Sequence, residues 1–241
     1  MNKYLCQGTL IYLLGITLSS AGVSLDSSRI IFNANDSHSG VSIGITSSES
    51  SLTSYLVKAQ ISLSPLGEEN NANTPFIVTP SLFRIEPNNT QSVLIIKKNQ
   101  DLPEDRESIF YFRATAIPSE KSNREQTSHQ VGGALKVAGV NVIKLFYRPS
   151  RLLTTQSQSM ANLVFSSEKH AVKINNPSPY YVTFNSLKIN NIYVDLDNAD
   201  AVSMIAPFSS VIYKNVPTQG AIEWKAINDY GAVETFNGEL K

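Results

Sequence analysis

The residues that most often perform catalysis or bind metals are few in this sequence and lie far apart. The 241 residues include three histidines and one cysteine, at His38, His129, His170 and Cys6. Metal and catalytic sites need such side chains close together, for example two histidines four residues apart on a helix. The sequence also contains no glycine-rich phosphate loop and no nucleophile elbow. We therefore expect no enzyme, no metal site and no cofactor.

One group of carboxylates is dense enough to suggest acid–base chemistry. Glu104, Asp105 and Glu107 lie within four positions, but Arg106 stands among them. Two carboxylates that share a site raise the pKa of one of them, and a neighbouring cation opposes that effect. This pattern favours a surface or interdomain charge cluster over a catalytic pair.

Overall charge excludes two classes of partner. The chain has 20 basic and 20 acidic residues, and the basic residues form no block. Attraction to nucleic acid or to an anionic membrane requires a basic patch or stripe. We therefore expect neither nucleic-acid binding nor adhesion to a membrane surface.

The first 21 residues differ from the rest of the chain. Lys3 precedes an uncharged apolar run at 4–18, and Ser19, Ser20 and Ala21 supply the small residues of a cleavage site. This pattern is typical of a secretory signal peptide. A membrane anchor is the alternative, but the run is shorter than the roughly 20 residues that a spanning helix needs. The mature chain would then contain no cysteine, and hence no disulfide.

The mature chain has the sequence pattern of an all-β protein. Short runs of β-branched and aromatic residues recur between Asn, Ser, Gly and Pro, as in β-sandwiches. Pro149 and the polar run after it indicate a boundary, so we expect sandwich domains at 22–150 and 151–241. The expected strands are 29–32, 41–46, 55–63, 76–78, 82–85, 93–96, 109–112, 172–175, 180–184, 187–194, 210–213 and 221–227.

The longest of the expected strands covers residues 134–149 and follows a polar loop at 119–133. Strands usually contain about five or six residues, so a strand of this length should overhang its sheet or lie at an edge. Proteins normally blunt a long apolar edge. An edge that stays open can pair with another chain.

Several separated blocks resemble the periplasmic pilus chaperones of the chaperone–usher pathway. The main blocks are Leu-Pro-Glu-Asp-Arg-Glu-Ser-Ile-Phe-Tyr at 102–111, Ile-Pro at 117–118 and Ile-Lys-Leu-Phe-Tyr-Arg-Pro at 143–149. Further similar pieces are Val-Ser-Leu-Asp at 23–26 with Arg29, Thr-Pro, Arg and Glu-Pro at 79–87, Asn-Pro-Ser-Pro-Tyr-Tyr at 176–181 and Ile-Asn-Asp-Tyr-Gly at 227–231. The likeness covers nearly all of the mature chain.

The resemblance implies two immunoglobulin-like domains in an L, or boomerang, and a function in the periplasm. Members of this family bind pilus subunits (pilins), which lack the last strand of their own sandwich. They deliver these subunits to an outer-membrane usher without ATP. The chaperone supplies the missing strand, here the stretch 134–149. The hydrophobic groove of the subunit would be filled by Leu135 and Val137 on one face of the strand and by Val140 and Val142 on the other. A bulge near Gly139 would bring both pairs to one surface.

The resemblance also implies two charged sites. Arg29 and Lys144 correspond to a basic pair that holds the C-terminal carboxylate of the subunit. Glu107, Arg148 and Asp229 correspond to a charge triad that links the two domains. Out of this context, Lys144 would be a solvated strand lysine and the triad three unrelated surface charges.

Two other functions compete with this interpretation. One is an exported β-sandwich binding module, such as an adhesin or carbohydrate binder, and the other is a secreted hydrolase on a β-sandwich. The sequence lacks the exposed aromatic cluster or calcium loop of the first and the acid–base constellation of the second. A homodimer that caps its own long edge is a further partner to consider.

Overall fold

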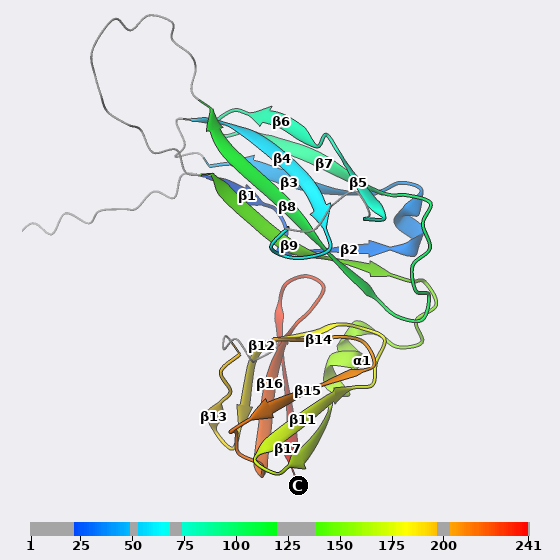
Figure 1. Cartoon of the computed structure of the whole chain (residues 1–241), viewed down its shortest axis with the longest axis vertical. Coiled ribbons are helices and arrows are strands. Elements are labelled where there is room, and N and C mark those ends of the chain that lie inside the picture. Colours follow the sequence, from blue (N-terminus) through cyan, green and yellow to red (C-terminus); the bar gives the residue numbers. More distant parts are fainter. Residues whose placement is uncertain (1–21, 49–52, 68–73, 120–137, 197–202, 241) are drawn as a thin grey trace, which may run out of the picture.

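The computed structural model describes residues 22–48, 53–67, 74–119, 138–196 and 203–240, and these residues form two β-sandwiches. Figure 1 shows the two sandwiches lying at an angle to each other and joined on one side. The expected all-β class is therefore confirmed. The N-terminal 21 residues, which carry the predicted signal peptide, lie outside the described residues.

The N-terminal sandwich consists of two sheets around one core. In one sheet the order is β1 (Val23–Leu25), β3 (Val41–Ser47), β7 (Thr90–Lys97) and β5 (Phe76–Thr79). In the other sheet the order is β2 (Arg29–Asn33), β9 (Gly139–Arg148), β8 (Ser108–Ser119), β4 (Ser54–Ser62) and β6 (Leu82–Ile85). The first strands of the chain, β1 and β2, thus belong to different sheets.

Alternation along the strands explains how the sequence builds this core. In β4, Tyr55, Val57 and Ala59 are buried, whereas Leu56 and Lys58 between them are exposed. Successive side chains of a strand point to opposite faces, so this period of two places one face against the core. β8 shows the same pattern and is the longest strand of the domain.

The C-terminal sandwich is smaller and has its own core. One sheet is β10 (Val164–Glu168), β11 (Ala171–Asn176) and β15 (Ser209–Lys214). The other is β13 (Ile192–Tyr193), β12 (Val182–Ile189), β16 (Gly220–Ile227) and β17 (Val233–Leu240), with β14 (Met204–Ile205) also paired to β12. Its buried residues form a cluster separate from that of the first domain.

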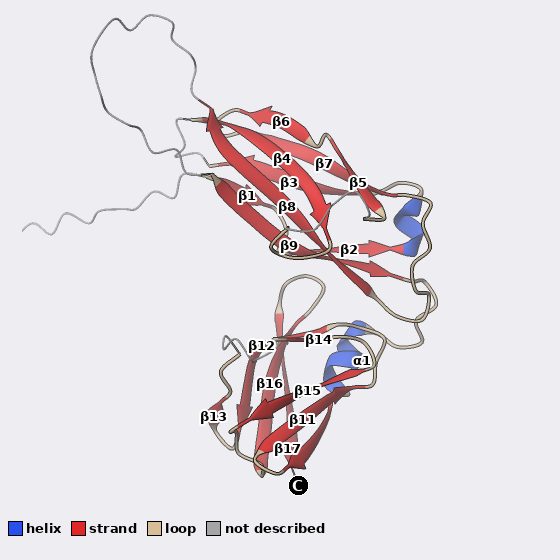
Figure 2. Cartoon of the chain, viewed as in Figure 1, coloured by secondary structure: helices blue, strands red, loops and turns tan. Residues whose placement is uncertain are grey.

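Two local features of this domain differ from the sequence expectation. The strands expected at 180–184 and 187–194 are one strand, β12, with an irregularity between Phe184 and Ser186, followed by a turn and the short β13. Figure 2 shows a helix among the strands, α1 (Gln156–Ala161), where a polar loop was expected. Thr155 caps this helix and Gln158 completes a capping box, which satisfies the first free amides.

Candidate functional site

β9 is half inside its sheet and half at the edge. Its residues from Lys144 to Tyr147 pair with β2 on one side and with β8 on the other, and Arg148 pairs with β2. Its residues from Gly139 to Ile143 pair with β8 alone within the described part of the chain. The strand was expected to overhang its sheet or to lie at an edge, and the edge position applies to the first half of β9 while the second half lies inside the sheet. In the first half, the backbone groups on one side have no strand partner.

The two faces of β9 have different surroundings. Leu145 is fully buried, and Ile143 and Tyr147 pack against the N-terminal core. The residues that alternate with these along β9, including Val140 and Phe146, face the other way. Of these, Phe146 packs on Tyr181 of the second domain, and Val140 is 44% exposed. The outward face therefore passes from open surface to interdomain contact along one strand.

The four apolar residues expected to enter a partner are only partly described. Val140 and Val142 lie on the outward face, on the same side as Lys144. Leu135 and Val137 lie outside the described residues. The pairing of β9 with β8 runs without a break from Gly139 to Tyr147, so the described part contains no bulge at Gly139.

Arg29 and Lys144 lie side by side where the open edge of β9 ends and its pairing with β2 begins. They are register partners in the parallel pair β2–β9, where neighbouring strands lie about 4.8 Å apart. Lys144 Nζ donates to Thr183 Oγ1 of the second domain over 3.5 Å, and Arg29 Nη1 donates to the Ile227 carbonyl at 3.0 Å. Neither cation forms an ion pair among the described residues.

Burial and mutual repulsion leave this cation pair in need of an anion. Burial, and then the charge of Arg29, lower the pKa of Lys144 to about 8. Burial also lowers the pKa of Arg29, although Asp229 and Glu107 oppose that shift. The Nε atom of Arg29 is buried without a hydrogen-bond partner. A carboxylate placed between the two side chains would accept charge-assisted hydrogen bonds and relieve the repulsion.

Arg148 joins two carboxylates from different domains. Its Nη1 and Nη2 donate to both oxygens of Asp229 at 2.7 and 2.8 Å, and its Nε donates to Glu107 Oε1 at 2.9 Å. Both carboxylates and hydrogen bonds hold the pKa of Arg148 above its usual range despite burial. The planar guanidinium suits such a fork, because its donors have fixed directions.

Glu107 is the most buried member of this triad and contacts the second domain twice more. Its side chain accepts the backbone N–H of Tyr181 at 2.9 Å, and its own N–H donates to the Pro179 carbonyl at 2.9 Å. Burial raises the pKa of Glu107, and Arg148 and the Tyr181 amide oppose the shift. By contrast, Asp105 and Arg106 form an exposed pair beside it. The carboxylate cluster at 104–107 is thus divided between surface and interdomain roles.

Some interdomain contacts had no signal in the sequence. Arg106 stacks on the ring of Phe208, with its guanidinium carbon 4.9 Å from the ring centroid. Gly231, at φ +79°, lies so close to the Ser28 hydroxyl that a side chain at this position would be strained and would displace it. Thr183, which receives Lys144, is a buried strand residue of an ordinary type. Contacts of this kind depend on how the domains meet, and no local pattern records that.

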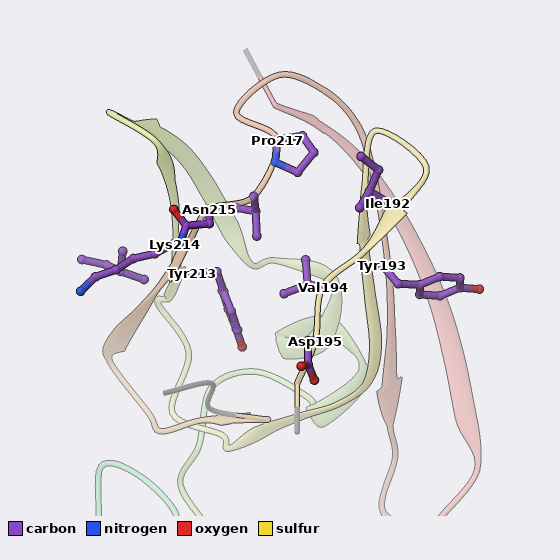
Figure 3. A pocket seen from close by; sticks show the side chains of 10 residues that line it. Ile192, Tyr193, Val194, Asp195, Tyr213, Lys214, Asn215 and Pro217 are labelled. Carbon is purple, nitrogen blue, oxygen red and sulfur yellow. The ribbon is translucent and has the colours of Figure 1, made fainter. Parts of the chain in front are cut away.

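The described residues also form a groove away from this region. A groove of about 570 Å³ lies in the second domain between β13 and the end of β15, where Tyr213 and Val194 point inward and Tyr193 points away (Figure 3). It shares no residue with the cation pair. Within the described ranges no acidic, histidine or cysteine residues gather as metal ligands, and none of the helices could cross a membrane.

Comparison with known families identifies the class. Residues 22–153 match the model of the PapD N-terminal domain of pili and flagellar-assembly chaperones, and residues 158–237 match the PapD C-terminal domain of pili assembly chaperones. The chain therefore belongs to the PapD family of pilus assembly chaperones. Such proteins act in the periplasm and are not enzymes, so the predicted family, function and location are confirmed.

Individual relatives are similar over nearly their whole length. The chaperone protein HifB of Haemophilus influenzae is 30% identical over 96% of each chain. The crystal structure of the periplasmic chaperone SfaE, 32% identical, superposes with a TM-score of 0.70 over 90% of this chain and 99% of SfaE. The SafB chaperone of Salmonella enterica, solved in complex with the SafA pilin, is 23% identical and has a TM-score of 0.75 over 92% of this chain and 98% of that one.

Proposed function

We propose that this chaperone binds pilus subunits by completing their fold with β9, and that it then delivers them to an outer-membrane usher. The open edge of β9 carries this proposal. Among the residues that the structure describes, the backbone from Gly139 to Ile143 has no strand partner on one side, and Val140 and Val142 face outward there. Added strands gain affinity from backbone hydrogen bonds, and alternate side chains give specificity.

The cation pair supplies the register of such a complex. Arg29 and Lys144 lie where the free edge ends, because β2 begins opposite Lys144. A carboxylate at the end of the subunit chain would be held there, and the rest of that chain would run along the open edge. Register matters because a slip of one residue turns every side chain to the wrong face.

The interdomain triad would keep the two sandwiches at the angle that this complex requires. Arg148 is bound from the first domain by Glu107, just before β8, and from the β16–β17 turn by Asp229. The sequence offers no nucleotide-binding loop, so the proposed binding of the subunit and its delivery to the usher rely on binding energy and not on ATP. In the free protein, a second copy could cover the same edge as a homodimer.

Co-expression with candidate pilins in a bacterial periplasm tests the proposal. The wild-type chaperone should protect a matching pilin from degradation and co-purify with it. Lys144→Ala should fold normally and lose the pilin, because the carboxylate loses one of its two cations. Lys58→Ala is the matched control, since it removes an exposed lysine from the same sheet. Equal recovery of pilin with both variants would contradict the proposed site.

A further inference from the structure

The turn between β16 and β17, residues 228–232, is held together by hydrogen bonds among its own residues and with Glu234. The Asn228 side chain accepts the backbone N–H groups of Tyr230 and Ala232 at 3.1 and 3.0 Å, and its own amide donates to Glu234. Backbone bonds from Asn228 to Ala232 and from Gly231 to Asn228 close the same loop. Side-chain and backbone hydrogen bonds thus fix the turn from within.

The same turn is fastened to the first domain at three points. Ile227, just before it, accepts the Arg29 guanidinium, Asp229 binds Arg148, and Gly231 lies against Ser28. Figure 1 shows the turn projecting from the second sandwich toward β2 and β9. The turn therefore lies beside the cation pair, because Arg29 is a member of that pair and is also hydrogen-bonded to Ile227.

Tyr230 is the exception within this anchored turn. It is 94% exposed, and its side chain forms no hydrogen bond or ring contact with the described residues. Its backbone amide is bound to Asn228, so the ring is carried by a fixed support. Aromatic residues on rigid supports make strong contact points, because a large flat surface is buried and few side-chain torsions are lost.

We propose that Tyr230 is a further subunit contact, which packs on an apolar side chain close to the C-terminal carboxylate of the bound subunit. This inference rests on the proposed function, which brings that carboxylate to Arg29 and Lys144. A chain that ends at Arg29 would have its last residues beside the turn, because Arg29 is hydrogen-bonded to Ile227 just before it. The turn presents one large side chain that neither domain uses.

The chemistry of a tyrosine ring defines the subunit end that it would select. Aromatic rings attract each other in offset or edge-to-face arrangements with centroids 4.5–7 Å apart. Subunits with an aromatic residue within the last few positions should therefore bind more tightly than those with small or charged residues there. The cation pair holds any carboxylate, so Tyr230 would supply discrimination that the anchor lacks.

Synthetic peptides provide the test. The probes are extended peptides of about twelve residues with a free carboxylate, with either phenylalanine or alanine near the end, and an amidated copy of each. We expect wild-type protein to prefer the phenylalanine peptide by about tenfold. Tyr230→Ala should remove this preference, and Tyr230→Phe should keep it. Tyr193→Ala is the matched control, because it removes an exposed tyrosine from β13.

The outcomes separate this contact from the proposed function. If binding needs the free carboxylate and Lys144 but Tyr230→Ala behaves like Tyr193→Ala, the tyrosine contact is wrong and the anchor stands. If wild-type protein shows no carboxylate-dependent binding, the proposed function fails and the contact fails with it. Tyr230→Trp gives a second readout, since its emission should shift to shorter wavelength when the peptide covers it.

Discussion

Arg29 and Lys144 occupy the same level of two parallel strands, and no acidic side chain among the described residues forms an ion pair with either cation. Two adjacent cations that are partly removed from water destabilise the fold that holds them. A structure retains such an arrangement when a ligand supplies the missing charge. The strain is therefore a measurable property of the free chaperone.

Lys144→Met should stabilise the free chaperone while abolishing its capture of subunits. Burial lowers the pKa of Lys144 to about 8, below its value of about 10.5 in an unfolded chain. The charged form is thus disfavoured in the folded state, fully so below pH 8. After allowance for solvent screening, removal of the charge should raise the free energy of unfolding by roughly 1 kcal/mol at pH 7. Chemical denaturation measures this difference.

The pH dependence of that difference provides the control. Between about pH 8 and 10.5 the unfolded chain holds the Lys144 proton more firmly than the folded one, so wild-type stability rises relative to Lys144→Met. The advantage of the variant should therefore shrink as pH rises through this window. A constant difference from pH 7 to 10.5 would show that the amine is not desolvated in solution.

Subunit binding should weaken as pH rises above about 8. Lys144 is then partly neutral in the free chaperone, and a bound carboxylate must first restore its proton. Uptake of one proton predicts a dissociation constant that rises about tenfold per pH unit above pH 8. Lys144→Arg should show a flat profile across the same range, because a guanidinium keeps its charge. Calorimetric titration with a carboxylate-terminated peptide at pH 7 to 9.5 measures both profiles.

The sequence predicted the parts of this fold that follow local rules. β4 alternates between apolar and small or polar residues, and the structure buries one face of it, as a period of two requires. Of β8 the sequence predicted only 109–112, and the structure extends that strand to Ser119. α1 gave no periodic signal because it has only six residues. Its start depends instead on the Thr155 cap. β12 contains an irregularity that shifts its register, which made one strand look like two.

The site was less accessible to sequence reasoning, because its members meet across domains. Arg148 lies 41 residues from Glu107 and 81 from Asp229, and only family resemblance suggested that they meet. The contact of Thr183 with Lys144 and the close approach of Gly231 to Ser28 had no sequence signal at all. Local periodicity reports the face that a residue presents. It does not report which other element that face will contact.

Substitutions on opposite faces of β9 should separate binding from folding. Val142→Asp lies on the outward face, so it should abolish subunit binding and change the free energy of unfolding by less than about 1 kcal/mol. Leu145→Ala removes a fully buried side chain from the other face and should cost about 2–5 kcal/mol. Denaturation curves and co-purification of a pilin measure the two effects. Strong destabilisation by Val142→Asp would mean that Val142 serves the core of the chaperone itself.

Arg148→Ala should be far more damaging than Arg106→Ala, although both remove an arginine paired to a carboxylate. The Arg148 side chain is 16% exposed and that of Glu107 is 2% exposed, whereas those of Arg106 and Asp105 are 43% and 61% exposed. Removing one partner of a buried pair costs about 3–5 kcal/mol, because the other charge stays buried alone. An exposed pair contributes about 0–1 kcal/mol. Chemical denaturation should therefore rank the two variants clearly.

Glu107, which stays buried when Arg148 is removed, should make the loss of stability of Arg148→Ala depend on pH. Without Arg148, the pKa of Glu107 should rise further, because burial alone already raises it. Glu107 then takes up a proton more readily in the variant, so the loss of stability should be largest at neutral pH and smaller near pH 5. Small-angle scattering should show a wider range of interdomain angles for Arg148→Ala than for Arg106→Ala. Identical scattering and a loss of stability that does not vary with pH would mean that the contacts of Glu107 with Tyr181 and Pro179 hold the domains without the ion pairs.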